Sequence, residues 1–103
     1  MKITVYSLEG CSFCESLKSK LKELHISFTD IKCDQHESLC DTIENITNCE
    51  TYPIIKIGYE YGKDLLLCVA NNHNQLGRID NFDNGKIMYL YSIDNMIDAI
   101  NKL

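Results

Sequence analysis

The first half of the chain alternates between strand-like and helix-like patterns of apolar residues. Residues 2–8 form an apolar run rich in β-formers, which predicts a buried strand. Over residues 13–24 the apolar side chains recur every three or four positions, as on one face of a helix: Phe13, Leu17, Leu21 and Leu24. Residues 25–32 alternate again and predict a second strand, reached by the short connection typical of a βαβ unit.

A second helix and a third strand are expected next. Asp34 and Glu37 have the spacing of a capping box, in which Asp34 caps the helix and Glu37 bonds back to its amide. Asn48, which tolerates the left-handed conformation, is expected to end the helix. Residues 54–57 predict the third strand, directly after Pro53. The apolar face expected for the second helix is Leu39, Ile43 and Ile46.

The pattern weakens after Gly58. Residues 64–70 predict a fourth strand, paired with the third as a hairpin, and residues 86–91 predict one more strand. Residues 71–85 are dense in Asn and Asp and predict a polar loop. Ser92 is expected to cap a last helix. The apolar face of that helix is Ile93, Met96, Ile97, Ile100 and Leu103.

Composition and charge narrow the class of protein. A chain of 103 residues suits a single domain, residues 1–103, with one modest core. Hydrophobic residues at 45% and charged residues at 24% are ordinary for a globular protein. The net charge of −5 disfavours nucleic acid and anionic membranes as partners. No apolar run approaches the roughly 20 residues of a membrane span, and we see no secretory leader.

Cys11 and Cys14 form a C-x-x-C pair where the first strand gives way to the first helix. The free amides and the positive dipole end of a helix N-terminus stabilise a thiolate. A thiolate next to a second cysteine can attack a disulfide and then be released by its neighbour. Thiol–disulfide chemistry is therefore the leading hypothesis, and a redox pair in a reducing compartment, the cytoplasm, fits better than a secreted disulfide framework.

The other cysteines leave alternatives open. Cys33, His36, Cys40 and Cys49 have a spacing that superficially suggests zinc, with His36 and Cys40 on one helix face. Nothing in the sequence brings Cys33 and Cys49 together, so we favour core thiols and predict no metal site. A regulatory disulfide between Cys40 and Cys49 is a further alternative. Cys68, within an apolar run, is expected in the core.

The order of the predicted elements, with C-x-x-C at the first junction, resembles the thioredoxin fold. Tyr6 before the C-S-F-C motif, Lys18 after it, and the segment Thr47–Pro53, which is similar to T-G-x-x-T-V-P, resemble glutaredoxins. The resemblance runs from about Lys2 to Ile57. It implies an α/β fold in which about three helices flank a mixed sheet of four or five strands. The stretch around residues 60–90 would be an atypical insertion.

The resemblance also implies roles for individual residues. Cys11 would be the nucleophile and Cys14 the resolving cysteine, with Pro53 cis beside them and Tyr52 offering its backbone to the substrate. The implied function is reduction of protein disulfides or glutathione mixed disulfides, with glutathione and disulfide-containing proteins as partners of a monomeric enzyme. The substrate-binding residues predicted in this way are Ser12, Phe13, Thr51, Tyr52 and Pro53.

Several residues depart from the family pattern. Leu8 stands where glutaredoxins usually carry lysine, Cys40 where many carry glutamine, and Glu50 where a basic residue is frequent. Tyr91–Ser92 replaces the usual Gly-Gly pair. Glutathione is an anionic tripeptide, so losing cationic contacts predicts weaker binding. A thioredoxin-like reductase that uses another electron donor is therefore an alternative.

Three further hypotheses concern single positions. Ser12 resembles the serine of glutaredoxins that hold a [2Fe–2S] cluster, which would make the protein a cluster carrier or a redox sensor. Lys18 could help to hold the Cys11 thiolate, although a solvated helix lysine is the expected role. Tyr59 and Tyr61 are interpreted as scattered exposed tyrosines rather than a peptide-binding surface.

Overall fold

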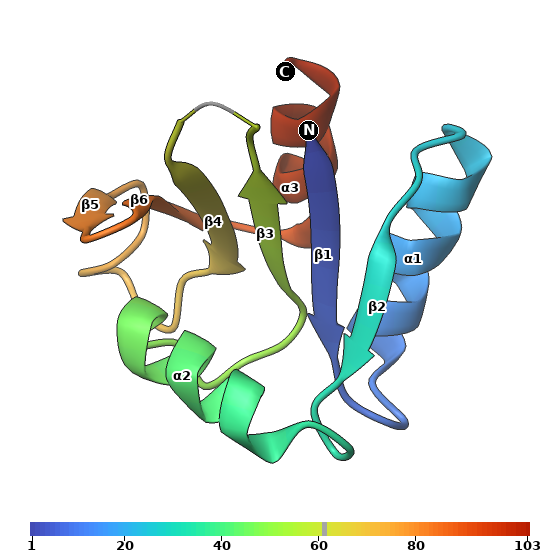
Figure 1. Ribbon diagram of the computed structural model, residues 1–103, viewed down its shortest axis with the longest axis horizontal. Helices are drawn as coiled ribbons and strands as arrows, with labels where there is room; N and C mark the ends of the chain where they lie inside the picture. The colour runs from blue at the N-terminus through green and yellow to red at the C-terminus, as the bar shows by residue number, and fades with distance from the viewer. Residues whose placement is uncertain (61) are drawn as a thin grey trace.

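Helices cover both faces of a six-stranded sheet in the computed structural model of the chain (Figure 1). The structure describes residues 1–60 and 62–103, so Tyr61 lies outside the described residues. In chain order the elements are β1 (Lys2–Ser7), α1 (Ser12–Glu23), β2 (Thr29–Lys32), α2 (Glu37–Thr47), β3 (Ile54–Gly58), β4 (Asp64–Val69), β5 (Ile79–Phe82), β6 (Gly85–Leu90) and α3 (Ile93–Asn101).

The strands lie in the order β2-β1-β3-β4-β6-β5. Strand β1 pairs with β2 in parallel and with β3 antiparallel, and β3 and β4 form the predicted antiparallel pair. Strand β6 returns parallel to β4, with β5 as an antiparallel edge strand beyond it. Residues 79–90 therefore widen the sheet on the side away from β2, as the arrows at the left of Figure 1 show.

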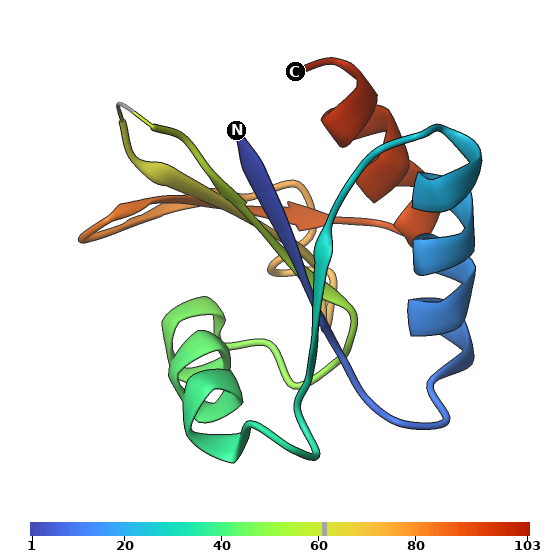
Figure 2. The same cartoon turned by 45° about the vertical axis from the view of Figure 1, so that its right-hand side comes forward.

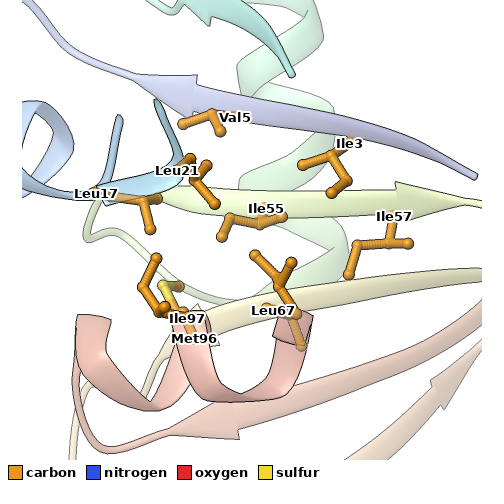
Figure 3. Packing of buried hydrophobic residues seen from close by; sticks show 10 residues of the cluster. Ile3, Val5, Leu17, Leu21, Ile55, Ile57, Leu67, Met96 and Ile97 are labelled. Carbon is orange, nitrogen blue, oxygen red and sulfur yellow. The ribbon is translucent and has the colours of Figure 1, made fainter. Parts of the chain in front are cut away.

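The two faces of the sheet carry different helices. Helices α1 and α3 pack on one face and α2 lies on the other (Figure 2). Because successive strand residues point to opposite faces, Ile55 belongs to the core under α1 and α3, whereas Ile54 belongs to the core under α2. Figure 3 shows the first of these cores, where Met96 and Ile97 of α3 pack with Leu67.

The sheet has more strands than the sequence predicts. The α/β class and the three helices are confirmed, but the predicted count of four or five strands is wrong, because β5 lies within the expected polar loop 71–85. A tight turn at 83–84 folds β5 back onto β6, with Phe82 opposite Gly85. Strand β2 is also shorter than the predicted 25–32, since the chain turns at His25 (φ 58°).

The helix ends agree only in part with the sequence pattern. The predicted capping box is wrong, because α2 has His36 at its N-cap with no side-chain bond. Asp34 instead accepts a hydrogen bond from the backbone N–H of Glu9 (3.2 Å). Asn48 does end α2 in the left-handed conformation (φ 54°), and Ser92 does cap α3 by accepting from an amide of its first turn.

Two helices are rotated relative to the predicted apolar faces. Phe13 on α1 is 66% exposed and Leu39 on α2 is 51% exposed. The buried stripe of α1 contains Cys14, Leu17 and Leu21, and that of α2 contains Cys40, Ile43 and Thr47. Both stripes keep helical spacing, but each includes a cysteine that a pattern of large apolar residues overlooks.

Candidate active site

Cys11 is the N-cap residue of α1 and is bonded to Cys14 in a disulfide. Its Sγ accepts a hydrogen bond from the Cys14 backbone N–H (3.2 Å), one of the amides that an α-helix leaves free at its start. The Cys11 side chain is partly exposed, whereas Cys14 is 0% exposed. An incoming sulfur atom can therefore reach Cys11, and Cys14 lies behind it.

The opposite wall of the site is the segment that ends at Pro53. The Tyr52–Pro53 peptide bond is cis, as the resemblance implied. Cys11 Sγ lies 3.9 Å from the Tyr52 carbonyl oxygen, a separation at which a Cys11 thiol can donate a weak hydrogen bond. Burial, together with the nearby carboxylates of Glu44 and Asp41, raises the pKa of Tyr52 to about 12, so its phenol stays neutral at physiological pH.

A groove of about 660 Å³ runs past Cys11 between these walls. Four of the five predicted substrate-binding residues line it, and Ser12 is exposed beside it. Four residues that depart from the family pattern, Leu8, Glu50, Tyr91 and Ser92, were not predicted to bind substrate, and all of them line the groove. It did not predict the other lining residues, which are Ser16, Lys20, Val69, Ile93 and Asp94.

The groove has few charges. Lys20 is the one cation among the described lining residues, and its Nζ forms an ion pair with Asp94 at the start of α3. The Asp94 carboxylate raises the pKa of Lys20, so the ammonium stays charged. Glu50 adds a negative charge on the other wall. The helical spacing of Lys20 from Phe13 could have indicated this residue, but its partner on α3 could not be read from local sequence.

Comparison with known proteins supports the resemblance. The family model described as Glutaredoxin matches residues 3–61, which is more than half of the chain. The chain belongs to the glutaredoxin family. Along the chain, 84 aligned residues are 33% identical to N-acetyl-S-hydroxy-L-cysteine reductase of Bacillus subtilis (strain 168), covering 74% of this chain and 90% of that protein. No solved structure matches.

Family membership settles the fold and the broad chemistry. This glutaredoxin has the thioredoxin-like fold that the order of its elements predicted, and it is a glutaredoxin-like thiol oxidoreductase. Within residues 1–60 and 62–103, no helix has the length and apolar character needed to cross a membrane.

Lys18 has a different role from either one expected. It is 8% exposed rather than solvated, and its Nζ binds Asp30 Oδ2 and Glu15 Oε1, each at 3.0 Å. Asp30 also accepts a hydrogen bond from Ser7 Oγ (2.7 Å). Burial opposes ionisation of Asp30, but the hydrogen bonds from Ser7 and Lys18 outweigh it and lower the pKa of Asp30. Lys18 thus joins α1 to β2 in this glutaredoxin instead of contacting Cys11.

Replacing Asp30 with asparagine is expected to lower the free energy of unfolding at pH 7 by about 2 kcal/mol, because the buried Lys18 loses a partly buried partner. A lowered carboxyl pKa stabilises the fold fully above the ordinary value of 3.8, and this contribution is lost as the pH falls through the folded-state pKa. Denaturant unfolding of both proteins should therefore show a difference that persists to about pH 4 and shrinks below it. Asp80→Asn, which removes an exposed pair with Arg78, is the control and should cost under about 1 kcal/mol.

The four remaining cysteines lie in the core under α2. Cys33 and Cys40 form a disulfide with their Cα atoms 5.6 Å apart, because the turn before α2 folds the chain back on itself. Cys49 instead contacts Cys68, with 2.9 Å between the sulfur atoms. The predicted alternative of a Cys40–Cys49 disulfide is therefore wrong, and so is the expectation that Cys33 and Cys40 are free thiols. Of the set with zinc-like spacing, Cys33 and Cys40 thus belong to one pair, Cys49 to the other and His36 to neither.

Proposed function

We propose that Cys11 and Cys14 are the catalytic couple of a reductase that acts on small mixed disulfides and sulfenic acids of cysteine derivatives. The observation that carries this proposal is the contrast between a partly exposed Cys11, held at a helix N-terminus, and a fully buried Cys14 directly behind it. Such a pair can take up a substrate sulfur atom and then release it.

In the proposed mechanism the reduced Cys11 thiolate attacks the substrate sulfur. With a mixed disulfide, a new S–S bond to Cys11 forms while the substrate S–S bond breaks and one thiolate leaves. With a sulfenic acid, the S–O bond breaks and the oxygen leaves as water after taking up a proton. Cys14 then attacks Cys11 Sγ, which releases the second substrate thiolate and leaves the Cys11–Cys14 disulfide. An external thiol donor returns two electrons and two protons to restore the dithiol.

The described charges in the groove, one lysine and two carboxylates, disfavour a substrate with more than one carboxylate. N-acetyl-cysteine derivatives, named for the Bacillus subtilis relative, carry one carboxylate and an acylated nitrogen. Lys20 could bind that carboxylate in competition with Asp94. Glutathione carries two carboxylates and one ammonium, and among the described lining residues its second carboxylate would find no further cation. Glutathione, the donor implied by the family, is therefore proposed to be a poorer substrate here.

Replacing Lys20 with glutamine tests this proposal. With the mixed disulfide of N-acetylcysteine as substrate and a dithiol donor, we expect kcat/KM to fall about two- to fivefold, as suits a partly exposed ion pair. The matched control is Lys22→Gln on the same helix, outside the groove, which should leave kcat/KM unchanged. Equal losses in both variants, or faster wild-type turnover of the glutathione mixed disulfide, would contradict the single-carboxylate assignment.

The electron donor is tested separately in a coupled assay. Glutathione with its reductase is compared with thioredoxin and thioredoxin reductase, and we expect the second pair to support the higher rate. A higher rate with glutathione would instead identify glutathione as the electron donor, as the family implies.

The [2Fe–2S] hypothesis rests on Ser12 and stays a prediction; a colourless protein after anaerobic reconstitution with iron and sulfide would exclude it. A reducing, cytoplasmic setting is likewise part of the proposal.

A further inference from the structure

Cys49 and Cys68 form a second pair of cysteines, separate from the catalytic couple. Their Sγ atoms are 2.9 Å apart, and both side chains are 0% exposed. Cys49 follows the end of α2 and Cys68 is in β4. The proposed mechanism uses neither of them, and neither lines the groove beside Cys11.

The pair lies where the groove wall meets the sheet. Cys68 is opposite Ile54 in the pairing of β3 with β4, so the segment that leads into β3 runs beside the end of β4. Along this segment Cys49 Sγ is 3.8 Å from the Val69 carbonyl oxygen, and Thr51 Oγ1 donates to the same oxygen at 3.5 Å. The residues between Cys49 and Ile54 line the groove, so a bond at Cys49 would anchor that wall.

We propose that Cys49 and Cys68 are a second thiol–disulfide couple, oxidised by small hydroperoxides to a disulfide that ties the groove wall to β4. A disulfide needs an S–S distance of about 2.05 Å, so the two sulfur atoms would have to approach by only about 0.9 Å from their 2.9 Å separation. This couple is independent of the roles proposed for Cys11 and Cys14.

The oxidation balances with the hydroperoxide as the oxidant. The Cys49 thiolate attacks the peroxide, an S–O bond forms as the O–O bond breaks, and an alcohol, or water in the case of hydrogen peroxide, leaves with a proton. The Cys68 sulfur then attacks Cys49 Sγ, the S–O bond breaks, and water leaves with the thiol proton of Cys68. Two thiols thus give two electrons to one peroxide. Contact with Cys68 lowers the pKa of Cys49 against the effect of burial, while the same contact and burial raise the pKa of Cys68, which suits these two roles.

Burial sets the order in which the two couples react. Tyr89 of β6 is paired with Cys68 in the sheet and donates its hydroxyl to the Thr47 carbonyl (2.6 Å), which closes the core around the sulfur pair. A peroxide can therefore reach the two sulfur atoms only when the exposed segment around Glu50 opens. Cys11 and Cys14 are expected to oxidise first, and Cys49 and Cys68 at higher peroxide concentration or after longer exposure.

The test uses the double variant Cys11→Ser/Cys14→Ser, which removes the catalytic thiols. The protein is treated with hydrogen peroxide, quenched in acid, denatured, alkylated and digested without reduction. We expect two fewer alkylated thiols than in the untreated protein, and a peptide linked through Cys49 and Cys68. In the reduced wild-type protein the same treatment should remove four alkylatable thiols, because Cys11 and Cys14 also oxidise.

Two outcomes would overturn the inference. One is that Cys49 and Cys68 stay alkylatable at peroxide concentrations and exposure times well beyond those that fully oxidise Cys11 and Cys14 in the wild-type protein. The other is a bond from Cys49 to any other cysteine. The variant Cys68→Ser provides a positive test. Without Cys68, Cys49 should be oxidised only as far as the sulfenic acid, which dimedone traps.

Discussion

Cys11→Ser is expected to reduce turnover of mixed disulfides by about a thousandfold or more, because a serine hydroxyl cannot replace the thiolate as nucleophile. Cys11 is the partly exposed sulfur of the pair, and the helix N-terminus that supports it is unchanged by the substitution. The measurement is a coupled assay with the mixed disulfide of N-acetylcysteine, and far-ultraviolet circular dichroism shows that the variant is folded.

Cys14→Ser provides the comparison that separates the two roles. Its Cys11 thiolate can still form a mixed disulfide, which excess monothiol in solution can resolve. We therefore expect this variant to keep part of its turnover when 2-mercaptoethanol is present. It should lose the reduction of substrates whose release requires formation of the Cys11–Cys14 disulfide. Equal loss of activity in both single variants would contradict the assignment of nucleophile and resolving cysteine.

Gly85→Ala is expected to destabilise the fold by about 3 kcal/mol, the largest effect on stability that we predict. Gly85 is paired with Asp64 where β6 begins beside β4. A Cβ atom at Gly85 would lie 2.7 Å from the backbone carbon and 2.9 Å from the backbone nitrogen of Asp64, and closer still to its carbonyl oxygen. Backbone atoms cannot move aside as a flexible side chain can, so the start of β6 must separate from β4.

Thermal unfolding of the reduced protein measures this effect. A loss of this size should lower Tm by more than about 10 °C in a domain of this length. The matched control is Gly58→Ala in β3, where an added Cβ would meet Asp64 Oδ1 at 3.6 Å, an ordinary contact. We expect its Tm to stay close to that of the wild-type protein. If the two variants unfold at the same temperature, the close approach of Asp64 does not explain why residue 85 is a glycine.

The central elements of the fold could be predicted because their signals are local. The periodicity of residues 2–24 places a strand and a helix on either side of Cys11, and Asn48 and Ser92 end or begin helices through their own backbone and side-chain chemistry. Strand β5 is not predicted because its sequence, Ile-Asp-Asn-Phe, lacks the alternation of a strand and forms one only by pairing with β6.

Local patterns in the sequence are enough to predict the C-x-x-C couple at a strand–helix junction, the order of the first elements and the segment ending at Pro53. Each of these is carried by residues within a few positions of one another. The contacts of Lys20 with Asp94, 74 residues later, and of Cys49 with Cys68, 19 residues later, arise from tertiary packing. Local periodicity cannot encode such contacts, since they depend on how helices and strands pack across the sheet.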